Sequence, residues 1–270
     1  MFECVINVSE GRDAPRLSRL DVASGASLRD RHSDTFHHRS VFTLINEAEA
    51  LVADVRSLIE ASLDELDLTG HVGVHPRLGV VDVVPFVALE TNRAARACAL
   101  RDETAQWLAA AFSVPCFLYG PVGDHVRTLP EIRRRAFRDL VPDVGPPATH
   151  PRWGATAVGC RPLLVAWNLW LEGLSLKDAR SLAAALRRPA LRTLALPVGG
   201  AVQISCNLID VSALRLSQVY DEILAALPPG ARVQRAELVG LAPAALLALE
   251  DPARLGQLGL SSERTIESRL

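Results

Sequence analysis

The order of strand-like and helix-like segments in the C-terminal part of the chain constrains its fold more than any other feature. Short apolar runs and stretches of helical periodicity follow in the order strand, helix, strand, strand, helix, strand: residues 163–170, 176–186, 191–198, 202–209, 216–227 and 233–241. Gly199 and Gly200 separate the two central strands, as in a hairpin turn. This β-α-β-β-α-β order is that of a split βαβ unit, so we expect a ferredoxin-like subdomain with a mainly antiparallel sheet.

The N-terminal half of the chain contains similar segments. We expect strands near residues 2–8, 41–46, 80–87 and 116–119, and helices near residues 51–66 and 93–112. The sequence therefore predicts an α/β (α+β) protein of two tandem ferredoxin-like split βαβ subdomains, residues 1–157 and 158–270.

A segment rich in proline and glycine, residues 143–156, joins the two predicted subdomains. Its composition excludes regular secondary structure. It also carries His150, Arg152 and Trp153, a combination that a plain spacer rarely needs. Since ligand pockets favour domain interfaces, these side chains favour a binding loop over a simple linker.

Composition and charge exclude several classes of protein. The 270 residues are 49% hydrophobic and 22% charged, as in an ordinary globular protein. The net charge is −2 and the arginines are spread along the chain, so we expect no nucleic acid as a partner. The run Arg133-Arg134-Arg135 is interpreted as a solvated helix face. The sequence has neither a basic leader nor a long apolar segment, so we expect a cytoplasmic protein with no membrane partner.

The lysine and cysteine content restricts the chemistry. Lys177 is the single lysine and lies at an expected helix start, which leaves no good candidate for a Schiff-base mechanism. No C-x-x-C pair occurs among the five cysteines, which lie mostly in apolar runs: Cys4, Cys98, Cys116, Cys160 and Cys206. We therefore expect reduced, buried thiols.

The turn before the strand at residues 80–87 has the densest group of reactive side chains. It combines two imidazoles, a guanidinium and a carboxylate with residues that break helices: His71, Gly73, His75, Pro76, Arg77, Gly79 and Asp82. Polar groups on the rigid edge of a buried strand are often binding residues, so the turn is a candidate site. Alternatively, His71 and His75 satisfy turn carbonyls and Arg77 pairs with a surface carboxylate.

Metal binding is a weaker interpretation of the same turn. The spacing of His71 and His75 is that of the helical zinc motif H-E-x-x-H, but Val72 follows the first histidine and the turn is not helical. We therefore expect no metal. A metal hydrolase would have to draw on the wider set of imidazoles: His32, His37, His38, His71 and His75.

Several segments in the same order resemble one known family. Residues 2–12 (FECVINVSEGR) resemble its opening E-C-V-P-N-F-S-E-G-R, residues 32–41 (HSDTFHHRSV) resemble H-S-D-x-D-H-N-R-S-V, and residues 73–79 (GVHPRLG) resemble G-E-H-P-R-M-G. Further matches lie at residues 114–120, 145–156 and 203–208. Ordered blocks are stronger evidence than any single motif. The family is the formiminotransferase domain of glutamate formimidoyltransferases, which in animals is fused to a cyclodeaminase.

The resemblance implies a fold and an activity. It implies two α/β subdomains with a ligand channel between them, and a homodimer as the assembly. It implies transfer of a formimino (or formyl) group from N-formimino-L-glutamate to N5 of tetrahydrofolate, the co-substrate, in histidine degradation. The partners would then be small molecules, and no metal is needed.

The resemblance also implies roles for particular residues. The catalytic histidine of the family falls on His75. On this basis we expect His32, Asp34, His38, Arg39 and Arg77 to bind the substrate. The folate-contacting loop falls on Gly145, Pro146, His150, Pro151, Arg152, Trp153 and Gly154.

The reaction chemistry agrees with these residue types. Attack of N5 on an amidine carbon gives an amine that must lose a proton, and the departing nitrogen must gain one, so a histidine suits both steps. Arg39 and Arg77 have planar forks suited to carboxylates. Asp34 or Asp82 would orient His75 or stabilise the amidinium, or would instead cap a turn.

Residues of the proline-rich loop suit the second substrate. Trp153 offers a flat face to a pterin or aminobenzoyl ring, and Arg152 and His150 suit the glutamate tail. The alternative for Trp153 is packing as a wedge between the subdomains.

Three positions depart from the family pattern near the expected centre. Val74 stands where the family has glutamate, Phe36 where it has an acidic residue, and His38 where it has asparagine. The loss of two carboxylates changes the charge around an amidinium. The alternative function is therefore a non-catalytic relative that binds folate or an anion.

Overall fold

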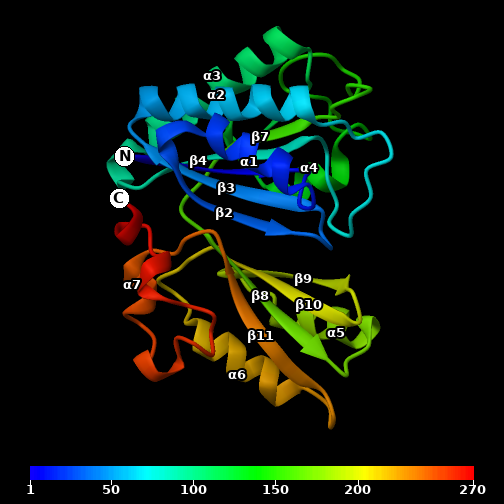
Figure 1. Ribbon diagram of the computed structural model, residues 1–270, viewed down its shortest axis with the longest axis vertical. Coiled ribbons are helices and arrows are strands. Elements are labelled where there is room, and N and C mark those ends of the chain that lie inside the picture. Colours follow the sequence, from blue (N-terminus) through cyan, green and yellow to red (C-terminus); the bar gives the residue numbers. More distant parts are fainter. The chain divides into compact units, whose positions relative to one another are not determined.

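The computed structural model describes residues 1–270, and the chain divides into two compact units, Met1–Pro162 and Leu163–Leu270 (Figure 1). The unit boundary lies five residues beyond the expected one, because a strand at Thr156–Cys160 belongs to the first unit. Each unit has its own sheet and its own buried core.

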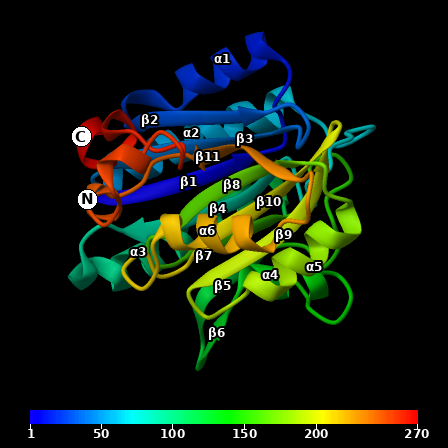
Figure 2. The same ribbon diagram turned by 90° about the horizontal axis from the view of Figure 1, so that it is seen from below.

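The second unit has the predicted ferredoxin-like fold. Its elements follow as β8 (Val165–Glu172), α5 (Leu176–Leu186), β9 (Leu191–Val198), β10 (Ala201–Leu208), α6 (Leu216–Ala226) and β11 (Arg232–Val239). The sheet order is β11-β8-β10-β9, and all neighbours are antiparallel. Both helices lie on one face of this sheet (Figures 1 and 2). The tail holds α7 (Ala244–Leu247) and the short helices η3 (Pro252–Arg254), η4 (Ser262–Arg264) and η5 (Glu267–Arg269).

The first unit contains the same fold in an extended form. Its first part is β1 (Phe2–Val8), α1 (Ala14–Ala23), η1 (Gly25–Ser27), β2 (Leu28–Asp34), β3 (Arg39–Asn46), α2 (Ala48–Glu65) and β4 (Val81–Ala88). Then follow η2 (Thr91–Arg93), α3 (Ala94–Phe112), β5 (Cys116–Val122), β6 (His125–Arg127), α4 (Leu129–Arg135) and β7 (Thr156–Cys160). The sheet order is β2-β3-β1-β4-β7-β5-β6, so the first four strands repeat the arrangement of the second unit.

The extension adds parallel pairing to a mainly antiparallel sheet. β7 pairs parallel to β4 on one side and parallel to β5 on the other. The predicted α/β class with mainly antiparallel sheets is confirmed. Helices α1, α2 and α3 cover one sheet face, where Phe2, Cys4 and Ile6 of β1 are fully buried. Ile132 of α4 packs instead in a separate small core. Because side chains alternate along a strand, Glu3 and Asn7 point to the opposite face.

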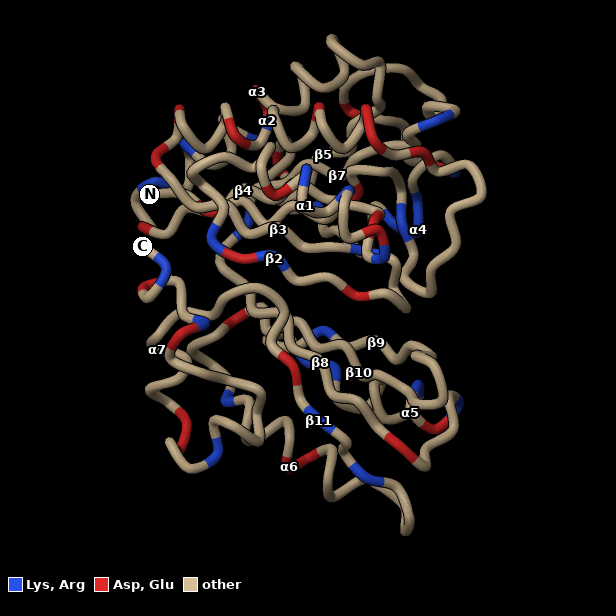
Figure 3. The backbone as a smooth tube through the Cα atoms, in the orientation of Figure 1, with Lys and Arg blue, Asp and Glu red and all other residues tan.

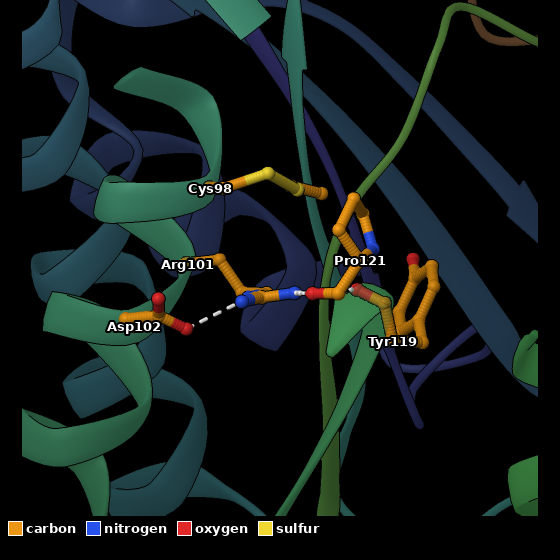
Figure 4. Close-up of a disulfide and its surroundings, with 6 residues drawn as sticks. Cys98, Arg101, Asp102, Tyr119 and Pro121 are labelled. Atoms are coloured by element: carbon orange, nitrogen blue, oxygen red, sulfur yellow. Dashed lines mark hydrogen bonds and ion pairs between the residues drawn. A yellow bond between two sulfur atoms is a disulfide. The ribbon is translucent and has the colours of Figure 1, made fainter. Parts of the chain in front are cut away.

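One prediction about the cysteines is wrong. Cys98 on α3 and Cys160 at the end of β7 form a disulfide, beside the buried Arg101 (Figure 4). The Cα atoms are 5.0 Å apart because α3 packs on β7, although 62 residues separate the two cysteines in sequence. Cys4, Cys116 and Cys206 are free and buried, as expected.

Basic and acidic positions are interspersed along the chain (Figure 3). None of the helices combines the length and the apolar character needed to cross a bilayer. No group of three or more His, Cys, Asp or Glu side chains is arranged to hold a metal ion.

Candidate active site

The candidate turn is an irregular loop between α2 and β4, as predicted. It lies against the turn between β2 and β3, where Val74 N donates to the carbonyl of Phe36 at 3.2 Å. Gly73 is required at this contact, because a Cβ atom there would collide with the carbonyl of His37. The loop and the β2–β3 turn therefore bring distant parts of the sequence into one site.

Arg77 fixes these two segments to each other. Its guanidinium donates to the carbonyls of His37 (2.9 Å), His38 (3.2 Å) and His75 (3.0 Å). It also contacts Nδ1 of His71 at 2.8 Å. Four of its five N–H groups are used in this way, so the main structural contribution of Arg77 is to brace the loop.

His71 and His38 stack under this brace, with ring centroids 4.0 Å apart. Nε2 of His71 lies 2.9 Å from the carbonyl of Ser9, so a neutral ring donates there and accepts from Arg77 on the other nitrogen. Burial, together with the charge of Arg77, lowers the pKa of His71 to about 4. His71 is therefore a neutral structural imidazole at physiological pH.

His38 adopts a left-handed backbone conformation (φ 50°) and reaches acceptors on both ring nitrogens. Nδ1 lies 3.1 Å from the carbonyl of Val72, and Nε2 lies 3.1 Å from Oε1 of Glu10. That carboxylate also accepts the backbone N–H groups of residues 11 to 13, which lowers its pKa against the effect of burial. Glu10 thus caps the start of the segment that leads into α1.

His75 occupies a different environment from His71 and His38, beside Arg39. The ring is half-buried, and its Nδ1 lies 3.0 Å from NH1 of Arg39 and 2.7 Å from the carbonyl of Pro76. Desolvation and the charge of Arg39 hold the pKa of His75 well below its usual range. The ring is therefore neutral at physiological pH.

The position of Nδ1 between a donor and an acceptor has a chemical consequence. With the proton on Nδ1, the ring donates to the Pro76 carbonyl and Nε2 carries a free lone pair, the form of a base. With the proton on Nε2, Nδ1 accepts from Arg39 and Nε2 is a donor. Both neutral tautomers have a partner, so the same ring is suited to taking up a proton and to delivering one.

Asp82, at the start of β4, anchors the arginine beside His75. Its carboxylate accepts from Arg39 NH1 (2.7 Å), from the backbone N–H of Leu78 (2.7 Å), and from NH2 and NH1 of Arg133 (2.6 and 3.2 Å). The side chain is 1% exposed, and these charges hold its pKa at about 2 despite burial. Arg39 is fixed further by Asn7, whose Oδ1 accepts from its Nε at 3.2 Å.

The other predicted substrate positions lie nearby in the first unit. Asp34 accepts the backbone N–H of His37 at 2.7 Å and so caps the β2–β3 turn, one of the two expected uses. His32 is half-buried on β2, opposite Val41 of β3.

The predicted folate loop lies beside the histidine loop. Val80 N donates to the carbonyl of Trp153 at 2.9 Å, and Gly154 takes a positive φ of 75° at this close approach. His150 stacks on Trp153 with ring centroids 4.4 Å apart, and its Nδ1 accepts two backbone N–H groups of the loop. Trp153 Nε1 donates to the carbonyl of Leu63 at the end of α2.

Trp153 also packs against the core of the first unit. A cavity of about 680 Å³ lies between the two loops and the turn after α4. Arg77 and Leu78 line one side, residues 137–141 another, and residues 147–149 the third.

Sequence reasoning missed Arg133. The run of three arginines was interpreted as a solvated face, and that holds for the exposed Arg134. Arg133 instead turns inward to Asp82, 51 residues away in sequence. No local pattern distinguishes these two neighbours.

Known proteins are similar to this chain over most of its length. Glutamate formimidoyltransferase of Streptococcus pyogenes is 29% identical over 92% of the chain and 90% of its own length. Its counterpart in Thermoplasma acidophilum is 28% identical over 90% and 88%. Formimidoyltransferase-cyclodeaminase of Gallus gallus is 32% identical over 83% of the chain, but the match spans 46% of that longer protein.

The fold and these relatives together define an α/β transferase. Residues 1–161 match the formiminotransferase domain, N-terminal subdomain. This chain belongs to the formiminotransferase family.

Proposed function

We propose that this enzyme transfers a formimino group from N-formimino-L-glutamate to N5 of tetrahydrofolate, with His75 as general acid and base. The observation that carries the proposal is the position of His75 Nδ1 between Arg39 and the Pro76 carbonyl. A neutral ring accepts the proton of the attacking amine, and the resulting imidazolium delivers it to the departing glutamate nitrogen.

The donor binds close to Arg39. One terminal nitrogen of that guanidinium contacts both Asp82 and His75, and Nε contacts Asn7, which leaves NH2 for a substrate carboxylate. The carboxylate role expected for Arg77 falls to its Nε, since its other N–H groups brace the loop.

Tetrahydrofolate binds against the loop at residues 145–154. The cavity beside this loop combines apolar side chains with Arg77 and Arg138, which suits a ring system that ends in carboxylates.

The reaction is tested directly with the purified protein. Supplied with formiminoglutamate and tetrahydrofolate, it should form N5-formiminotetrahydrofolate, detected by mass spectrometry. His75→Gln should lower kcat by a factor of about 10² to 10⁴, the usual contribution of general acid–base catalysis. Undiminished turnover by a folded His75→Gln variant would remove His75 from the mechanism.

A matched control comes from the exposed His125 on β6. His125→Gln should leave kcat and KM unchanged. Circular dichroism of all three proteins shows whether the fold is retained.

The second candidate function is folate or anion binding without transfer. It is favoured by Phe36 and Val74, which are 43% and 39% exposed at the contact between the two site segments. No carboxylate at these two positions faces an incoming amidinium. Calorimetric binding of tetrahydrofolate without product formation would support this second function over the first.

A further inference from the structure

Arg133 stands apart from the other arginines of its helix. It lies in the last turn of α4, and the side chain is 18% exposed, whereas the next residue, Arg134, is exposed. Ile132 is fully buried and anchors α4 in a small core with Val83 and Phe117. This anchor turns Arg133 toward the start of β4.

The contact of Arg133 with Asp82 is bidentate. NH2 lies 2.6 Å from Oδ2, and NH1 lies 3.2 Å from Oδ1. Oδ2 is also the atom that holds Arg39 at 2.7 Å, and Arg39 in turn contacts His75. A chain of direct contacts therefore links α4 to the imidazole through two side chains.

We propose that Arg133 is a positioning residue for His75: it fixes the Asp82 carboxylate, which holds Arg39 against Nδ1, and it keeps a net positive charge beside the ring. Two guanidinium groups share one carboxylate, so the cluster carries an excess charge of one. An adjacent positive charge disfavours a second proton on imidazole. This inference rests on the proposed function of His75.

The ionisable groups around His75 come from several elements. Arg39 lies on β3, Asp82 on β4 and Arg133 on α4, while His37 of the β2–β3 turn lies 5.7 Å away between ring centroids. Arg77, on the loop itself, bonds the His75 carbonyl. Asp82 is the negative charge in this set, and Arg133 is the group that offsets it without touching the ring.

A high proton affinity would be a disadvantage for the proposed reaction. An imidazolium that forms at neutral pH in the free enzyme cannot act as the base for N5. By offsetting Asp82, Arg133 adds to the effects of desolvation and Arg39, which keep His75 unprotonated until the substrate supplies the proton. The proton is then transferred readily to the leaving nitrogen.

The test separates charge from geometry with two substitutions. Arg133→Gln removes the charge, whereas Arg133→Lys keeps the charge but loses the fork that holds both oxygens of Asp82. Titration of His75 is followed by NMR with ¹⁵N-labelled histidine, and its signal is assigned by its loss in His75→Gln. The acid limb of kcat/KM against pH is measured on the same proteins.

We expect the His75 midpoint and the acid limb to rise by about one pH unit in Arg133→Gln, the size of shift that one nearby charge produces. Arg133→Lys should show the His75 midpoint of the wild-type protein. Its kcat should still be about tenfold below the wild-type value, because Arg39 is held less firmly. Arg134→Gln on the same helix is the matched control and should behave as the unsubstituted protein.

Equal His75 midpoints in folded wild-type and Arg133→Gln proteins overturn the proposal. An equal rise of the His75 midpoint in Arg134→Gln also overturns the proposal, since loss of any positive charge from α4 would then have the same effect. If Arg133→Gln does not fold, Arg133→Met is measured instead, and an unchanged midpoint there has the same meaning. Absence of any transfer by the wild-type protein would refute the proposed function, while the NMR titration would still decide the role of Arg133.

Discussion

Two buried carboxylates of the first unit show how partners decide the ionisation of single residues. Asp82 has four hydrogen bonds from two arginines and a backbone N–H, and its pKa lies at about 2. Glu3 on β1 is 3% exposed, and burial raises its pKa from 4.5 to about 7 although Arg161 opposes the shift. Burial without sufficient partners therefore makes Glu3 a source of pH-dependent instability.

The sign of this dependence follows from linkage. The folded protein binds the Glu3 proton more tightly than the unfolded chain does, so the stabilisation is complete below pH 4.5 and is lost as the pH rises to about 7. We compare the unfolding free energy of Glu3→Gln with that of the wild type. The difference in favour of Glu3→Gln should increase by up to about 3 kcal/mol between pH 4.5 and pH 8. Urea unfolding of both proteins at these two pH values measures the gain, and a constant difference would contradict it.

Individual residues of the site differ in whether the sequence can predict them. His75, Arg39, Arg77 and Asp82 were found from the composition of one turn and from ordered motifs, and the structure brings them together. Arg133 was not found, because the direction of a side chain in a run of arginines depends on how Ile132 packs. Tertiary packing, not local sequence, selects it.

At the scale of elements, strands and helices with a clear apolar pattern were predicted and the others were missed. All six main elements of the second unit were found. In the first unit, β2 was missed because its residues are charged and none is fully buried, as is usual for an edge strand. α1 buries only Leu17 and Leu20, and β7 is made of small residues, so neither gives a strong periodic signal.

The loop between α2 and β4 is an element without regular structure, and Arg77 supplies its order. Arg77→Lys should free the carbonyls of His37, His38 and His75, because one ammonium group cannot reach all three. We expect a local loss of about 1–3 kcal/mol. Hydrogen exchange should then accelerate in residues 71–79, and kcat should fall.

A pure carboxylate-binding role for Arg77 predicts a different result. KM for the donor would rise while the exchange of residues 71–79 stayed at its wild-type rate. Arg134→Lys is the control for a conservative change that touches neither the loop nor the cavity.

At the scale of the whole molecule, the disulfide is the observation that sequence reasoning did not anticipate. It closes a loop of 62 residues, for which chain-entropy arguments give about 4 kcal/mol of stabilisation. We expect three titratable thiols in the denatured, non-reduced protein, and a loss of stability of this size in Cys98→Ser. Cys206→Ser in the second unit is the control for loss of a buried thiol.

This disulfide and the predicted cytoplasmic location lead to opposite expectations. A reducing cytosol keeps most thiols reduced. Rapid alkylation of the protein in intact cells, followed by mass spectrometry of Cys98, decides between them.

The place of β7 in the sheet has a consequence for synthesis on the ribosome. β7 lies between β4 and β5, but it is the last strand of the first unit to be made, at residues 156–160. Until they leave the exit tunnel, β4 and β5 each present an open edge toward the vacant position between them. At 5–20 residues per second, the interval between the completion of β4 and the arrival of β7 is on the order of several seconds. The nascent chain is therefore exposed to mispairing in this interval, and a chaperone that shields strand edges would act here.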